Sequence, residues 1–411
     1  MRDRNRTGLF VAVLITLLCA APLHAQDDTT DNPLLRLLAY VPDTDIYREF
    51  ISYGDLALWN ASWGIDRIES VEALEQRSAA SDLDVPATLL VLTRQTGAPN
   101  VLGPQYLLSD DLRGYSGIDL LNTDRFIEAG NPPEMLTVIE TADSANVPAA
   151  LAASGYDESA LGEATLFSKG EDFEVNIQER DIPVVAQLAA LNRVALLEDA
   201  VVIARATAIV EGALSAAAGE TATLADDPVY RAGALAVSDP ALTGDGALVG
   251  AMFMGQAEPL DLMQVLGSRA TPEQIEALRE ALDVGVSVPV YDLAVFATRR
   301  RADDTQLVLA LVFPAGIDAQ AATDALLMRM KRYTSLRTNQ PLIDLWAERG
   351  VEIEWGRSQE IGGLPVGLVS ISARNPAFDE DENGRVNTYV FSWQDMIYTR
   401  DLGFMAVTTD D

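Results

Sequence analysis

The sequence predicts an α+β fold with two domains, in each of which helices pack on one face of a mostly antiparallel β-sheet. Two observations lead to this prediction. Short runs of β-branched and apolar residues alternate with turns rich in glycine, asparagine and aspartate, and amphipathic helical stretches lie between them. In addition, a β-hairpin followed directly by a helix occurs at residues 193–218 and again at 291–333, so we expect ferredoxin-like hairpin-helix modules.

The first 25 residues have the three parts of a secretory signal peptide. Three of the first six residues are arginines, Leu9–Ala21 is apolar, and Ala25 provides the small residue at the cleavage site. A transmembrane anchor needs about 20 apolar residues, which is more than this stretch offers, and the leucines before Cys19 do not fit a lipoprotein signal. The sequence therefore predicts cleavage after Ala25 and a secreted, extracytoplasmic protein that keeps no integral membrane segment.

Cleavage would also remove the only cysteine, Cys19, and the only histidine, His24. A mature chain without these residues cannot use a Ser–His pair, a catalytic cysteine or histidine-ligated zinc, and it cannot form a disulfide. A Ser–Lys dyad would need Lys169 or Lys331, and neither lies in an S-x-x-K frame. We therefore assign no catalytic residue.

The composition is that of an acidic protein able to form a large core. Hydrophobic residues make up 48% of the 411 residues, and 62 acidic against 29 basic residues give a formal net charge of −33. This charge repels phosphate backbones, so nucleic acid is excluded as a partner. Composition indicates neither another partner nor an oligomeric state.

The N-terminal domain is expected at residues 33–240, after a flexible polar lead at 26–32. Its most aromatic stretch, Tyr47–Trp63, is either the buried face of a helix or a platform on which a ligand stacks. Residues 65–134 read mostly as helices and loops. The further elements expected here are a short helix at 34–38, strands at 135–140 and 164–168, a hairpin at 193–205 followed by a helix that ends at Gly219, and helices at 147–154 and 228–237.

A joint rich in glycine and aspartate, Ser238–Gly246, separates this domain from the C-terminal domain at 246–411. In the second domain, helices are expected to begin at the capping box of Thr271 and at Asp318. The buried face of the latter helix should carry Ala322, Leu326, Met330 and Tyr333. The expected strands are 247–254, 291–299, 306–313, 352–355, 366–373, 388–392 and 404–407.

Three short stretches resemble a group of exported bacterial proteins without an assigned activity. They are LLAYVPDT…FISYGDLALW within Leu37–Trp59, the loop FIEAGNPPEML at Phe126–Leu136, and TLADDPVYRA at Thr223–Ala232. In that group similar blocks occur in the same order behind a signal peptide. The resemblance extends over residues 34–240. It implies an extracytoplasmic location and repeated α+β modules, and it implies no catalytic residue.

The sharpest local motif is D-E-D-E-N-G at Asp379–Gly384. Asp379, Asp381 and Asn383 stand at the first, third and fifth positions of a calcium loop, where oxygen ligands belong, and glycine follows at the sixth. Val390 occupies the twelfth position, which normally carries a bidentate glutamate. The motif therefore indicates either a weak calcium site or an Asn-Gly hairpin turn between two strands. No other cofactor is indicated.

Together these observations favour a secreted, acidic, soluble protein that serves as a non-enzymatic binding or interaction module for an unidentified ligand. The alternative is a carboxylate-only hydrolase acting on glycans, because glycoside hydrolysis needs only two carboxyl groups. Glu352 and Glu354, expected on one face of a strand beside Trp355, are the nearest candidates for that chemistry. A deep cleft with facing carboxylates would favour the hydrolase, and shallow solvated faces would favour the binding module.

Overall fold

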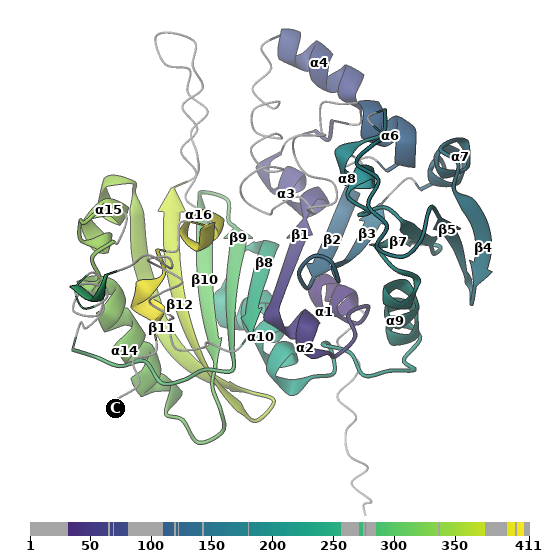
Figure 1. Cartoon of the computed structure of the whole chain (residues 1–411). Helices are drawn as coiled ribbons and strands as arrows, with labels where there is room; N and C mark the ends of the chain where they lie inside the picture. The colour runs from purple at the N-terminus through teal and green to yellow at the C-terminus, as the bar shows by residue number, and fades with distance from the viewer. Residues whose placement is uncertain are drawn as a thin grey trace, which may run out of the picture.

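The computed structural model describes residues 32–64, 66–68, 70–80, 110–118, 121, 123–141, 144–179, 181–255, 271–273, 276, 285–335, 338–374, 393–398 and 401–406. The strands are β1 (Phe50–Asp55), β2 (Thr123–Ala129), β3 (Leu136–Thr141), β4 (Asp157–Leu161), β5 (Ala164–Ser168), β6 (Arg193–Leu196), β7 (Ala200–Ala204), β8 (Ala247–Gly255), β9 (Leu293–Arg300), β10 (Asp304–Val312), β11 (Val351–Ile361) and β12 (Leu364–Arg374). Within the described ranges they form one 12-stranded antiparallel sheet, in the order β11-β12-β10-β9-β8-β1-β2-β3-β7-β6-β5-β4 (Figure 1). The predicted α+β class with a mostly antiparallel sheet is confirmed.

The first strand of the chain lies in the interior of the sheet. β1 pairs with β2 on one side and with β8 on the other, so that Ile51 faces Ala129 in one neighbour and Phe253 in the second. The predicted domains at 33–240 and 246–411 therefore contribute β1–β7 and β8–β12, respectively, to one continuous sheet. Their division into two independent units stays a prediction.

Helices cover both faces of the sheet. One face carries α1 (Pro33–Leu38), α2 (Asp45–Glu49), α9 (Thr207–Ala217), α10 (Pro228–Ser238) and α11 (Pro240–Thr243). The opposite face carries α3 (Leu56–Trp63), α4 (Val71–Ala79), α6 (Asp110–Ser116), α7 (Val147–Ala153), α8 (Val184–Gln187), α14 (Ala319–Arg332), α15 (Leu342–Glu348) and α16 (Trp393–Tyr398). The expectation of helices on one face was therefore wrong. The central strands are long apolar runs with both faces buried: Val295 of β9 packs on the first face and Phe296 on the second.

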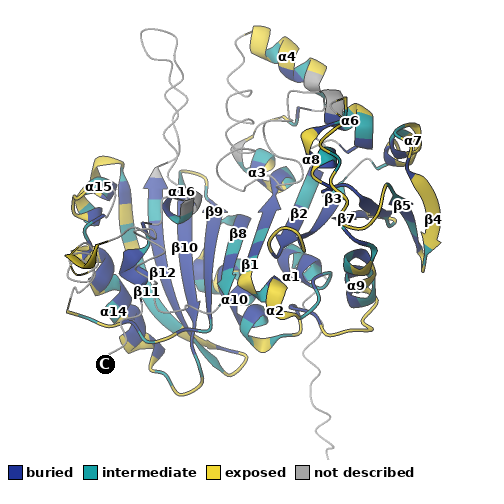
Figure 2. Ribbon diagram, viewed as in Figure 1, coloured by how far each residue is buried: buried dark blue, intermediate teal, exposed yellow. Residues whose placement is uncertain are grey.

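The buried core reflects this arrangement. Among the described residues, a single hydrophobic cluster on the first face extends from β5 to β12, and β9 and β10 appear mostly dark blue in Figure 2. On the second face there are two clusters, one beneath α3, α7 and α8 and one beneath α14, α15 and α16. None of the helices in the described ranges is long and apolar enough to span a membrane.

Both predicted hairpin-helix modules are present, as β6–β7–α9 and β9–β10–α14. Asp318 caps α14 by accepting from the N–H groups of Gln320 and Ala321, and the predicted face of this helix is buried. Asp227 caps α10 in the same way, which confirms the helix expected at 228–237. The two modules place their helices on opposite faces, because α9 packs in the first cluster and α14 in the second.

The sequence patterns did not predict strands at β1, β2 or β4. The block Phe126–Leu136, expected to be a loop, contains the end of β2 and the start of β3. β2 is difficult to recognise from sequence because it contains charged residues. Arg125 forms ion pairs with acidic residues on neighbouring strands. Glu128 is buried and accepts a hydrogen bond from Thr137 Oγ1 at 3.2 Å. β4 is an exposed edge strand, so it lacks the apolar alternation that marks a half-buried strand.

The strand expected at 404–407 was also wrong, since Gly403–Met405 forms a short 3₁₀ helix. The carbonyl oxygens of Gly403 and Phe404 accept hydrogen bonds from the buried guanidinium of Arg329 at 3.1 and 2.8 Å. A side chain thus satisfies backbone groups that a strand would have paired in a ladder. The strand expected at 388–392 lies outside the described residues, as does most of the helix expected from Thr271.

Candidate functional site

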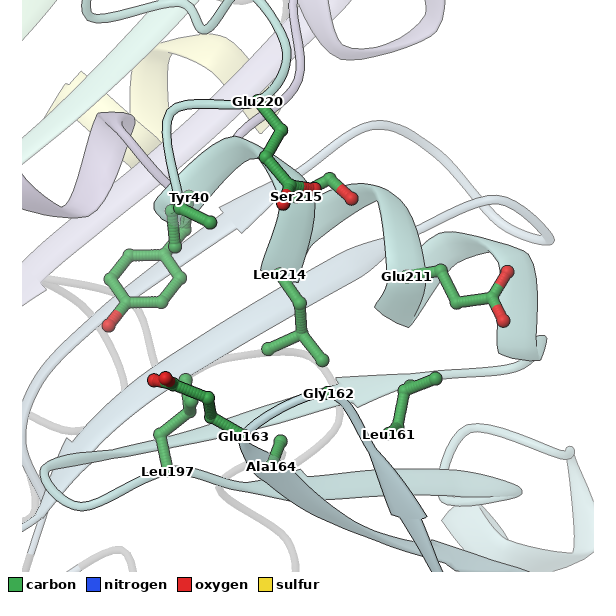
Figure 3. A pocket seen from close by; sticks show the side chains of 12 residues that line it. Tyr40, Leu161, Gly162, Glu163, Ala164, Leu197, Glu211, Leu214, Ser215 and Glu220 are labelled. Atoms are coloured by element: carbon green, nitrogen blue, oxygen red, sulfur yellow. The ribbon is translucent and has the colours of Figure 1, made fainter.

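The candidate site lies beneath α9, between this helix and two turns of the sheet. Val210 and Ala213 of this helix are fully buried in the cluster on the first face. Leu214 follows Ala213 in sequence, lies one turn after Val210, and is only partly buried. Figure 3 shows its side chain pointing from α9 towards the strands below.

Two turns at the end of the sheet form the floor below Leu214. The β4–β5 turn is tight because Gly162 has a φ of +61°, and it places Leu161 opposite Ala164. Leu197 comes from the β6–β7 turn, where its N–H donates to the carbonyl of Ala200 at 2.9 Å. Leu161 and Leu197 pack against the main cluster and remain partly exposed, so the floor is apolar and open to solvent.

Between α9 and these turns lies a cavity of about 530 Å³. Three glutamates, Glu163, Glu211 and Glu220, line its exposed margin, and none of its twelve lining residues is basic. Figure 3 places Glu163 on the same side of the pocket as Tyr40, and Glu220 beside Ser215. The pocket therefore combines an apolar floor with a concentration of negative charge at its rim.

Tyr40 supplies the one phenol of this lining. Burial raises the pKa of Tyr40, and the carboxylates of Asp199 and Glu140 raise it further. The hydroxyl therefore keeps its proton at neutral pH. A neutral hydroxyl can donate or accept a hydrogen bond, so Tyr40 can orient a polar group without contributing charge.

The residues that the sequence proposed as a calcium site, Asp379, Asp381 and Asn383, lie outside the described residues, so that hypothesis stays a prediction. In the part of the chain that the structure describes, no cluster of three or more acidic, histidine or cysteine side chains is arranged to hold a metal ion.

The carboxylate pair considered for glycan hydrolysis is not at the cavity. Strand β11 has an irregular register between Ile353 and Trp355, which interrupts the alternation expected for Glu352 and Glu354. Arg301 pairs with the Glu354 carboxylate at 2.6 Å, and Ser370 Oγ donates to it at 2.7 Å. These partners give Glu354 a structural role on the edge strand β11. They do not favour a catalytic role for Glu354.

The aromatic stretch contributes Tyr47, Tyr53 and Trp59 to the core, whereas Phe50 is only partly buried. Tyr47, Tyr53 and Trp59 are each less than 10% exposed, the first two on one face of the sheet and Trp59 on the other. A buried ring cannot stack on a ligand, so we do not assign a ligand platform to these three residues.

The two lysines have different surroundings. Lys331 is exposed on α14. The Lys169 ammonium lies 5.1 Å from the ring centroid of Tyr115 and 5.7 Å from that of Tyr156, and it donates to the carbonyl of Ser154 at 2.9 Å. Two aromatic faces and a carbonyl hold this cation in place between β5, α6 and α7. It therefore acts as a packing element.

Comparison with known proteins gives little further information. No protein-family model matches the sequence, and no curated protein matches it. Two crystal structures of TP0453, form III and form I, match with 9% and 7% sequence identity and TM-scores of 0.32 and 0.34. The matches cover 82% of this chain and 93% and 92% of the two TP0453 chains. Similarity at this level carries no argument about function.

Proposed function

We propose that this protein is a secreted, non-enzymatic binding module whose pocket beneath α9 takes small organic cations with an apolar body. The observation that carries the proposal is the composition of the pocket. Leu161, Leu197 and Leu214 supply apolar surface, and the charged lining residues are all glutamates. Ligand sites of this kind combine an apolar interior with a few polar groups that select the ligand.

The exposure of the glutamates suits a cation that stays partly hydrated. Glu163, Glu211 and Glu220 are all exposed, so a ligand's charge would approach them without complete loss of its hydration shell. This avoids the large desolvation penalty of a fully buried ion pair. The formal net charge of −33 further raises the local concentration of cations around the protein.

The expected affinity is modest. Drug-sized ligands gain about 0.3 kcal/mol per non-hydrogen atom, so a ligand of about 15 such atoms would gain about 4–5 kcal/mol. That corresponds to a dissociation constant on the order of 1 mM. Binding should weaken as ionic strength rises, because salt screens exposed charges.

A series of probes with the same apolar tail separates the contribution of apolar contacts from that of the ligand's charge. Hexylammonium, hexanol and hexanoate share an apolar chain and differ in charge. Saturation-transfer NMR on the mature protein should show the strongest binding for hexylammonium, weaker binding for hexanol and none for hexanoate. Equal signals from all three would contradict a role for the glutamates, and no signal from any would remove the proposal.

Variants locate the binding to this pocket. Leu214→Asn should abolish the hexylammonium signal, and Glu163→Gln should reduce the preference for hexylammonium over hexanol. Glu158→Gln is the matched control, because Glu158 is an exposed glutamate of the neighbouring strand β4 that does not line the cavity. If the control changes binding as much as Glu163→Gln, only the overall charge matters and the pocket is not a specific site.

Secretion is the other part of the proposal and is supported by the signal-peptide pattern of residues 1–25. Mass spectrometry of protein from its native host should find Gln26 at the N-terminus in the extracytoplasmic fraction. An intact Met1, or a lipid on Cys19, would contradict it.

A further inference from the structure

Among the described residues, more than half of the large apolar side chains with high exposure lie in one short segment. They are Phe173, Val175, Ile177, Val184 and Leu188, which are 42%, 50%, 65%, 48% and 45% exposed. We refer to these five residues as the 173–188 surface. The other exposed apolar side chains, Ile46, Leu58, Val290 and Met328, are spread over the rest of the chain. Such a concentration on a secreted protein marks an interaction site or an aggregation hazard.

A backbone hydrogen bond brings the two parts of this segment together. The backbone N–H of Asn176 donates to the carbonyl of Gln187 at 2.8 Å, so Val175 and Ile177 lie next to the end of α8. Val184 and Leu188 are four residues apart on α8 and its C-cap, so they share one side of this turn. The yellow residues of the α8 region are visible in Figure 2.

Buried polar residues hold the loop from below. Asn192, which is 7% exposed, donates from Nδ2 to the carbonyls of Glu171 and Glu174 at 3.1 and 2.9 Å. Arg193, which is 6% exposed, donates to the carbonyls of Lys169 and Gly170 and pairs with Asp172 at 2.7 Å. The segment is thus ordered before any partner binds, which lowers the entropy lost on association.

The loop also contains local strain. Phe173 has a φ of +61°, in the left-handed region that non-glycine residues rarely adopt. Its N–H donates to the carbonyl of Arg205 at 2.9 Å, which fixes that conformation. Phe173 therefore stays at the surface although its backbone conformation is unfavourable and its ring is not fully buried.

The charges around the segment indicate its partner. Glu171, Glu174, Glu179 and Asp181 alternate with the apolar residues and are exposed, Asp172 is exposed and pairs with Arg193, and Arg180 is the one basic residue in the sequence of this segment. A second copy of this chain, also carrying −33, would be repelled. We propose that the 173–188 surface binds a cationic amphipathic segment of a partner protein, with its apolar side chains on these residues and its basic side chains towards the carboxylates.

This surface is separate from the pocket. α8 packs on the second face of the sheet through Val185 and Ala186, whereas Leu161 and Leu214 of the pocket pack on the first. The two proposals therefore rest on different residues and can fail independently.

The test uses a fluorescent amphipathic helical peptide of leucine and lysine, titrated with the mature protein and followed by anisotropy. Ile177→Ser/Val184→Ser should weaken binding at least tenfold. The matched control, Val290→Ser/Met328→Ser, removes side chains of similar exposure elsewhere and should leave affinity unchanged. Because all four residues are exposed, thermal melting should be the same for wild type and both variants.

Equal affinity in the two double variants would overturn the proposal, since the acidic surface as a whole would then account for binding. So would equal binding of a leucine–glutamate peptide. Two further measurements identify a different occupant: phosphatidylcholine vesicles that bind wild type but not Ile177→Ser/Val184→Ser, or a concentration-dependent dimer in ultracentrifugation that the same variant loses. Either result would overturn the polypeptide partner.

Discussion

Arg125 lies directly opposite Asp55 on the neighbouring strand, and its Nε donates to Asp55 Oδ2 at 2.7 Å. The same guanidinium reaches Glu140 on the next strand at 3.2 Å, and Arg36 of α1 pairs with Glu140 at 2.9 Å. Asp55 is 1% exposed and also accepts from the N–H of Leu58 at the start of α3. This chain of four charges crosses three strands and ties two helices to the centre of the sheet.

Loss of Arg125 should be strongly destabilising. Arg125→Met leaves the Asp55 carboxylate buried without its cation, and breaking a buried pair in this way costs about 3 kcal/mol. Arg36→Met is the control, because the Arg36 side chain is 39% exposed and Glu140 keeps Arg125. Its cost should stay below about 1 kcal/mol. Urea unfolding measures both, and similar losses would show that the Asp55 pair is not a main contact.

The pH dependence of stability should report on Asp55. Burial raises the pKa of Asp55, and the Leu58 N–H and Arg125 only partly counter this. The folded protein therefore binds this proton more tightly than the unfolded chain does. The contribution of Asp55 to stability is thus largest below the ordinary pKa of 3.8 and falls as pH rises through the raised value. The difference in unfolding free energy between wild type and Asp55→Asn should decline over that window. A difference that increases with pH would contradict the direction of the shift.

Gly54 should not tolerate a side chain. A Cβ at this position of β1 would overlap the ring of Phe126, with Cζ only 2.9 Å away. Gly54→Ala should cost about 1–3 kcal/mol through overpacking. The double variant Gly54→Ala/Phe126→Leu should lose less than the sum of the two single variants, because leucine leaves room for the methyl group. Strict additivity would locate the strain elsewhere.

The Asp379–Gly384 motif can be tested without knowledge of its structure. If it binds calcium, the missing glutamate at Val390 places the affinity at the weak end, on the order of 10⁻⁴–10⁻³ M. Calcium should then raise the melting temperature of wild type more than magnesium does at matched ionic strength, and Asp381→Ala should remove that difference. Equal shifts with both ions would reduce the motif to a charged turn.

Local signals in the sequence predicted much of this fold. The run Gln306–Phe313 and the capped helix after Asp318 were identified because their apolar spacing and capping residue are contained in short windows. β2 was missed because its arginine is neutralised only by residues on other strands. The pocket was missed for the same reason: Tyr40, Leu161, Leu197 and Leu214 come from four separate parts of the chain. A pattern within one short stretch of sequence does not show which distant residues come together in the fold.

The interior position of β1 also has a consequence for the newly made chain. Emerging N-terminus first, β1 can pair with β2, but its other edge stays bare until β8 has followed. A bare strand edge is a template for pairing with another molecule. Until synthesis has reached Gly255, each chain therefore offers the same unpaired strand edge to its neighbours. The risk of misassembly then depends on how fast the rest of the chain follows, and not only on the stability of the finished protein.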